Sequence, residues 1–144
     1  MVIAILAIVV VGIVLYEQSQ NSIDLFSGTA GKMNASDIAT YARQAGFSGN
    51  DLATAVAIAL AESSGNPTVV GDLNLTPGGS VGLWQINLKA HPDLAAGDLT
   101  DPQTNANAAY AVYQAAGNSF HPWTTYKTGA YTAYLATAQQ VVNA

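Results

Sequence analysis

The chain opens with a purely apolar run. Residues 1–16 contain no charged side chain and are rich in valine and isoleucine. Such a run predicts a helix, which at 1.5 Å per residue reaches about 24 Å, against roughly 30 Å for the hydrocarbon core of a bilayer. Flanking polar residues and local thinning of the bilayer close a gap of this size. We therefore expect a membrane anchor.

Two other interpretations of residues 1–16 stay open. A cleaved signal peptide fits less well, because no basic residue precedes the run and no small-x-small cleavage site follows it. A hydrophobic helix buried inside an assembly is the other alternative. Residues 17–33 are polar and rich in glycine and serine, which is typical of a tether. The folded domain is then expected over residues 34–144.

Within that domain, apolar and capping residues predict two helices close together. Ser36 is a candidate N-cap for a helix over residues 37–45, and Asn50 for a second over residues 51–63. In the second segment alanines and large apolar residues occupy nearly every face. A helix that is apolar all round is buried, so we expect it at the centre of the domain.

Three further elements follow. Residues 69–85 carry a turn signal between β-branched residues and predict a small hairpin or irregular excursion. Asp101 precedes a proline, which predicts a helix over residues 102–116, and residues 129–142 predict a last helix. The expected fold is mainly α with a small β excursion, preceded by the hydrophobic helix.

Composition narrows the possible partners. The net charge is −5, the isoelectric point is about 4.5, and charged residues make up 9% of the chain. This acidic balance lacks the basic surface that phosphate backbones need, so nucleic acid is excluded as a partner. Cysteine is absent, and His91 and His121 have no partners at ligand spacing. We expect no metal site and no cofactor.

Glu62 is the strongest candidate for chemistry. It is one of two glutamates and ends the apolar segment 52–61. A carboxyl group at the edge of an apolar helix is desolvated, which favours its neutral form and raises its pKa. A raised pKa is what a general acid needs to donate a proton near neutral pH.

The motifs around Glu62 resemble a known family. A Glu-Ser pair at 62–63 is followed by Ser-x-Gly-Leu-x-Gln-Ile at 80–86, Asp-Pro at 101–102 and Trp-x-x-Tyr-x-x-Gly at 123–129. In this order they resemble the lysozyme-like superfamily, specifically SLT-type lytic transglycosylase domains, and are most similar to small muralytic domains carried by phage particles. The resemblance spans roughly residues 36–135 and implies an α+β lysozyme-like fold.

The resemblance also implies roles for single residues. Glu62 matches the catalytic acid of the family. Ser80 and Gln85 match positions that line the cleft, with Gly82 in the tight turn beside them. Tyr126 matches a tyrosine that lies close to the catalytic carboxyl group.

One position departs from the family pattern. Lys127 stands where the family usually has asparagine. We expect its ammonium group to point to solvent, with the role of the asparagine lost or moved to Asn87. Trp84 is a candidate for stacking on a sugar ring or for the core, whereas Trp123 is expected in the core.

The reaction has two possible forms. Glycosidases with two carboxylates need a second acid near the first, and Asp72 is the best candidate, ahead of Asp93 and Asp98. The resemblance implies instead that Glu62 acts alone, first as acid and then as base toward the muramoyl 6-hydroxyl. That route gives 1,6-anhydromuramoyl ends, and we favour it over hydrolysis.

The expected protein is thus a peptidoglycan-cleaving enzyme attached to a membrane through residues 1–16. Its partners are glycan strands and possible virion proteins, and its location is a virion membrane or a bacterial inner membrane, with the domain facing the cell wall. The expected role is local wall opening during phage entry. Two alternatives stay open: a catalytically inactive structural protein that keeps the fold, and a glycan-binding module.

Overall fold

Short helices account for most of the computed structural model, which describes residues 31–75 and 77–144. Residues 31–144 form one compact unit. The predicted anchor over residues 1–16 and most of the predicted tether lie outside the described residues. Within the described ranges, no helix is both long and apolar enough to cross a bilayer.

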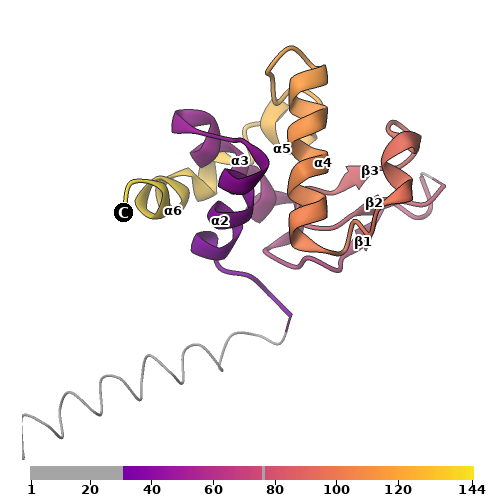
Figure 1. Ribbon diagram of the computed structural model, residues 1–144, viewed down its shortest axis with the longest axis horizontal. Helices are drawn as coiled ribbons and strands as arrows, with labels where there is room; N and C mark the ends of the chain where they lie inside the picture. The colour runs from indigo at the N-terminus through magenta and orange to yellow at the C-terminus, as the bar shows by residue number, and fades with distance from the viewer. Residues whose placement is uncertain (1–30, 76) are drawn as a thin grey trace, which may run out of the picture. The chain divides into compact units, whose positions relative to one another are not determined.

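The order of elements agrees with the predicted mixture of helices and a small sheet (Figure 1). The elements are α2 (Ala35–Ala45), α3 (Gly49–Ser63), β1 (Val70–Gly71), β2 (Ser80–Val81), β3 (Ile86–Asn87), a 3₁₀ helix η1 (Pro92–Ala96), α4 (Pro102–Ala115), α5 (Thr124–Lys127) and α6 (Thr132–Val142). The prediction of a mainly α domain with a small β part is confirmed. The short elements η1 and α5 were not predicted, and α6 begins three residues later than expected.

The starts of α2 and α3 also differ from the prediction, whereas that of α4 agrees with it. Helix α2 is capped by Asn34, whose Oδ1 accepts the backbone N–H of Asp37 at 2.9 Å, and not by Ser36, because the helix begins earlier. Helix α3 begins after Ser48, so Asn50 lies inside its first turn. Helix α4 starts as predicted, with Asp101 accepting a backbone hydrogen bond at its N-terminus.

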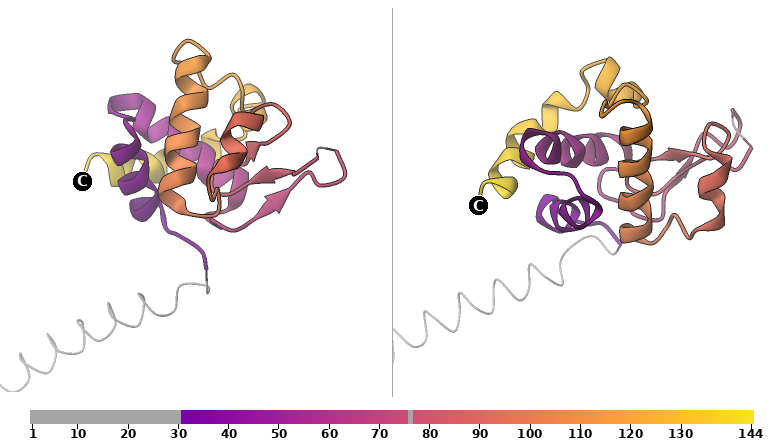
Figure 2. Two further views of the ribbon diagram at one scale, coloured as in Figure 1. Left: turned by 45° about the vertical axis from the view of Figure 1, so that its right-hand side comes forward. Right: turned by 45° about the horizontal axis from the view of Figure 1, so that its top comes forward.

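Helix α3 is the central element of the domain, as its apolar sequence predicted. It packs against α2, α5 and α6, and the views in Figure 2 agree with this arrangement. Its buried residues cover most of its surface: Leu52, Ala53, Ala55, Val56, Ala57, Ile58, Ala59 and Ser63. The many alanines allow the neighbouring helices to approach closely.

The β part is a three-stranded antiparallel sheet in the order β1–β2–β3. Val81 in the middle strand pairs with Val70 on one side and with Ile86 on the other. The turn between β1 and β2 projects away from the helices, as the left view of Figure 2 shows. In Figure 1, α4 lies between the sheet and the group formed by α2, α3 and α6.

A buried asparagine joins α4 to the turn between β2 and β3. Asn105 is fully buried, and its Nδ2 donates to the backbone carbonyls of Val81 (2.9 Å) and Leu99 (3.0 Å). Its Oδ1 accepts the backbone N–H of Trp84 at 2.9 Å. Gly82, in the same turn, has φ +79°, and a Cβ there would collide with the Asn105 side chain. The amide therefore fills the space that the glycine leaves.

Two tryptophans link the turn between β2 and β3 to helices α3 and α5. The indole N–H of Trp84 donates to the backbone carbonyl of Ala55 in α3, at 2.9 Å. The indole N–H of Trp123 donates to the backbone carbonyl of Trp84, at 2.8 Å. Trp123 directly precedes α5, so α3, the β2–β3 turn and α5 are held in one fixed arrangement.

Candidate active site

Glu62 lies in the last turn of α3 and is partly buried. Its Oε1 accepts a hydrogen bond from the hydroxyl of Thr125 in α5, at 2.7 Å. Sequence reasoning did not single out Thr125, although its hydroxyl lies next to Tyr126 in the recognised motif. Helix α5 was not predicted either, so no pattern in the sequence indicated which side chain meets Glu62.

Burial raises the pKa of Glu62 above its ordinary value of 4.5. The hydrogen bond from the Thr125 hydroxyl and the nearby backbone N–H of Thr125 lower the pKa, and the negative charge of Asp72 raises it. The negative end of the α3 dipole acts in the same direction as burial. The net shift is upward, as the apolar sequence around Glu62 predicted, and this suits a group that must donate a proton.

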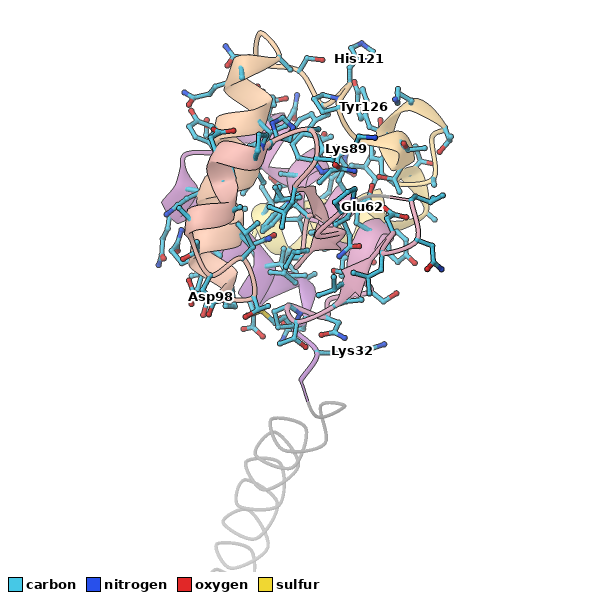
Figure 3. All side chains as sticks on the ribbon, turned by 90° about the vertical axis from the view of Figure 1, so that its right-hand side faces the viewer. Lys32, Glu62, Lys89, Asp98, His121 and Tyr126 are labelled. Atoms are coloured by element: carbon cyan, nitrogen blue, oxygen red, sulfur yellow. The ribbon has the colours of Figure 1, made fainter. Side chains whose placement is uncertain are left out.

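A polar groove of about 320 Å³ surrounds Glu62. It is lined by residues from α3, the sheet, its turns and the segment before α5: Glu62, Asp72, Ser80, Gln85, Asn87, Pro122, Trp123 and Thr124. Figure 3 shows Glu62 on the face of the domain turned toward the viewer, with Lys89 and Tyr126 above it. Four predicted site residues besides Glu62, which are Asp72, Ser80, Gln85 and Asn87, therefore meet in one place.

Asp72 and Ser80 form a pair on the sheet side of the groove. The hydroxyl of Ser80 donates to Oδ2 of Asp72 at 2.9 Å, and Ser80 is almost fully buried. Asp72 has φ +58°, so the carboxylate is held in a tight turn directly after β1. It is the second carboxylate of the groove, as the sequence predicted for the hydrolytic alternative.

Gln85 has a side chain that is fixed by the protein. Its Nε2 donates to the backbone carbonyls of Val69 (3.2 Å) and Gly82 (2.9 Å). Both amide protons are thus used inside the protein. Its carbonyl oxygen, Oε1, lies beside Gly71 of β1, where an added Cβ would come within 2.6 Å of it.

The side chain of Asn87 is also fixed by the protein, but through its carbonyl oxygen and not through its amide nitrogen. Its Oδ1 accepts the backbone N–H groups of Lys89 (3.1 Å) and Ala90 (3.0 Å). Its Nδ2 remains as a donor. The groove is therefore lined by two amide side chains that the protein holds in place, and such polar groups recognise hydroxyl and acetamido groups.

A second hollow of about 270 Å³ adjoins the groove. The two share Gln85, Asn87, Pro122 and Trp123, and the second one adds His91 and the apolar side chains of Ile86, Ala90 and Val112. Because the two hollows share lining residues, they lie side by side on the domain.

A larger hollow, of about 430 Å³, lies at the other end of α3. It is lined by the first turn of α3, the end of α6 and Arg43 of α2, and no carboxylate lines it. Size alone would favour this hollow. The groove at Glu62 is the candidate site because it contains the carboxylate with the perturbed pKa.

Trp84 does not contact the groove. Its side chain is fully buried, and its indole N–H is used in the bond to α3. The prediction that it stacks on a sugar ring is wrong, because a buried indole presents no face to a ligand. Trp123, only 5% exposed, is a core residue as expected, although part of it reaches the groove.

The resemblance implied that Tyr126 of the last motif lies close to the catalytic carboxyl group. The hydroxyl that is bonded to Glu62 belongs to Thr125, and the ring of Tyr126 packs against Phe120, His121 and Tyr131. Tyr126 does not line the groove. A direct contact of Tyr126 with substrate stays a prediction.

Lys127 is exposed and does not contribute to the pKa of Glu62. The expectation that it points to solvent is confirmed. Asp93 and Asp98 are also exposed and lie outside the groove, and Asp98 accepts a hydrogen bond from Thr100. Among the described residues, no group of three histidines or acidic residues is arranged to hold a metal ion.

Comparison with known families identifies the domain. The family model described as a lysozyme-like domain matches residues 39–125, which is more than half of the chain. The chain belongs to the SLT-type lysozyme-like domain family. The matched segment contains every residue that lines the groove, together with Thr125. Searches of curated proteins and of solved structures returned no match.

The family assignment gives the domain a class of substrate. SLT-type lysozyme-like domains cleave peptidoglycan, which supports peptidoglycan-cleaving activity for this domain at the level of the family. A small mainly α domain with a three-stranded sheet agrees with an α+β lysozyme-like fold.

Proposed function

We propose that this lysozyme-like domain is a lytic transglycosylase acting on the β-1,4 bond between N-acetylmuramic acid and N-acetylglucosamine, with Glu62 as both acid and base. The observation that carries the proposal is the placement of Glu62. It lies at the end of a buried helix, with a pKa raised by burial, and it lines a groove equipped with polar groups.

The reaction needs two proton transfers. Glu62 gives its proton to the glycosidic oxygen while the bond from that oxygen to muramoyl C1 breaks. The muramoyl 6-hydroxyl then bonds to C1, and its proton passes to the Glu62 carboxylate. No water is consumed, the product carries a 1,6-anhydro ring, and Glu62 regains its starting state.

Hydrolysis is the second candidate, and the position of Asp72 favours it. Asp72 lines the same groove as Glu62, and its charge raises the pKa of that residue. In a hydrolase with two carboxylates, Asp72 would act as nucleophile or activate a water molecule. The hydroxyl of Ser80 donates to Oδ2 of Asp72 and so holds this carboxylate in place for either role.

Mass spectrometry of muropeptides released from purified peptidoglycan separates the two reactions. The wild-type chain, Glu62→Gln and Asp72→Asn are compared. Products one water lighter than the hydrolysis products, absent with Glu62→Gln and present with Asp72→Asn, are the expected result. Removing a general acid lowers the rate by roughly 10²- to 10⁴-fold.

Other outcomes point elsewhere. Reducing ends that require both carboxylates identify a muramidase. Binding to insoluble peptidoglycan without release of fragments, unchanged by Glu62→Gln, identifies a glycan-binding or structural domain. In that case Lys127, which stands where the family usually has asparagine, is the first position to consider as the cause of the missing activity.

We propose further that residues 1–16 anchor the protein in a virion membrane or a bacterial inner membrane, with the domain facing the cell wall. The uncharged apolar sequence and the polar segment 17–33 support this placement. A role in local wall opening during phage entry follows from it. Sedimentation of the full chain with lipid vesicles, and loss of sedimentation when residues 1–16 are deleted, tests the anchor.

A further inference from the structure

The carboxyl group of Glu62 is held by one side chain, that of Thr125, within the described residues. The distance from Thr125 Oγ1 to Glu62 Oε1 is 2.7 Å, and the residues are 63 positions apart in the chain. A threonine hydroxyl has one proton to donate. Because that proton goes to Oε1, the other carboxyl oxygen, Oε2, remains for the proton that a neutral carboxyl group carries.

The position of the hydroxyl is fixed independently of Glu62. Trp123, two residues before Thr125, is buried and bonded to the backbone of Trp84. Trp84 is bonded in turn to Ala55, which lies two helical turns before Glu62 in α3. These contacts form a closed circuit from α3 through two indoles to α5 and back to α3. Thr125 is therefore preorganised against the carboxyl group.

We propose that Thr125 is the positioning residue of Glu62: by donating to Oε1 it fixes the plane of the carboxyl group and reserves Oε2 for the transferred proton. The inference rests on the proposed role of Glu62 as acid and base. The same oxygen then gives the proton to the glycosidic oxygen and receives the proton of the muramoyl hydroxyl.

None of the other charged and titratable groups discussed around Glu62 positions its carboxyl group as the Thr125 hydroxyl does. Asp72, in the turn after β1, repels the ionised form, whereas Lys127 of α5 is exposed and contributes nothing to the pKa. Tyr126 of α5 packs its ring against neighbouring aromatic side chains. Since the hydroxyl bond favours the ionised carboxylate, its removal is expected to raise the pKa of Glu62 further.

The test uses the full chain with glutamate labelled by ¹³C at the side-chain carboxyl group. The chain has two glutamates, Glu17 and Glu62, so the spectrum holds two signals and Glu62→Gln assigns them. Thr125→Val removes the hydroxyl with little change of shape, and Thr125→Ser keeps it. Thr128→Val is the matched control, because its hydroxyl bonds to a backbone carbonyl of its own segment.

With Thr125→Val we expect the Glu62 carboxyl to titrate at higher pH and the alkaline limb of the pH–rate profile to move the same way. The value of kcat falls about five- to tenfold, the ratio that corresponds to one hydrogen bond, with KM nearly unchanged. Thr125→Ser restores the wild-type titration, and Thr128→Val leaves it unchanged.

A Thr125→Val protein whose Glu62 titrates as in the wild type overturns the proposal, and so does a Thr125→Ser protein that behaves like Thr125→Val. The titration needs no enzymatic activity. If wild-type protein releases no muropeptides while the titration still shifts in Thr125→Val, the proposed reaction fails and the hydrogen bond remains established.

Discussion

Replacing Asn105 by alanine is expected to be among the most damaging single changes in the domain. Asn105 is fully buried and makes three hydrogen bonds of 2.9 to 3.0 Å to the backbone of three residues, Val81, Trp84 and Leu99. Alanine leaves the N–H of Trp84 and the carbonyls of Val81 and Leu99 without this partner. A buried group without a partner costs roughly 1–3 kcal/mol, so the loss of three partners lowers the free energy of unfolding by roughly 3–9 kcal/mol.

A loss of this size approaches the whole stability of a small domain, which is about 5–15 kcal/mol. Equilibrium urea denaturation followed by tryptophan fluorescence measures it, since the chain has two tryptophans and both are buried. Asn107→Ala is the matched control. It lies on the same helix, is exposed, and loses one hydrogen bond from Gln103. The control is expected to change stability by less than about 1 kcal/mol. An equally small loss with Asn105→Ala would refute the reasoning.

Two further predictions concern stability. Gly82→Ala places a Cβ against Asn105 and is expected to lower the free energy of unfolding by roughly 1–3 kcal/mol more than Gly117→Ala does. Gly117 is the control because its φ is similar (+74° against +79°), but no atom lies within 4 Å of its added Cβ. Equal losses of stability in thermal melts would contradict a role for the collision. Glu62→Gln is expected to become more stable relative to the wild type as pH rises. The folded state holds the Glu62 proton more tightly than the unfolded chain does, so the contribution of Glu62 is fully present below its ordinary pKa of 4.5 and is lost as pH rises through the raised value. Denaturation of both proteins at about pH 4 and about pH 8 measures the difference, and a constant difference would exclude a raised pKa.

The site could be predicted from the sequence only in part. Glu62 and its raised pKa followed from one acidic residue beside a long apolar run, which is a local pattern. Ser80, Gln85 and Asn87 lie within eight residues of one another, so a single motif was enough to place them together. Thr125 carried no local signal, because its partner is 63 residues away.

The error at Trp84 has a physical cause. An aromatic side chain in a motif can pack in the core or face a ligand, and the sequence does not distinguish these uses. Trp84 is buried because a carbonyl of α3 accepts its N–H. Tyr126 packs its ring against Phe120, His121 and Tyr131.

The sequence by itself determined the helices whose ends depend on neighbouring residues. Asp101 caps α4 through a backbone N–H three positions away, and Gly46 ends α2 with φ +124°. Such bonds are local, so a short stretch of sequence contains both partners. The tertiary structure alone decided which hydroxyl meets Glu62, because that contact exists only after α3 and α5 have packed together.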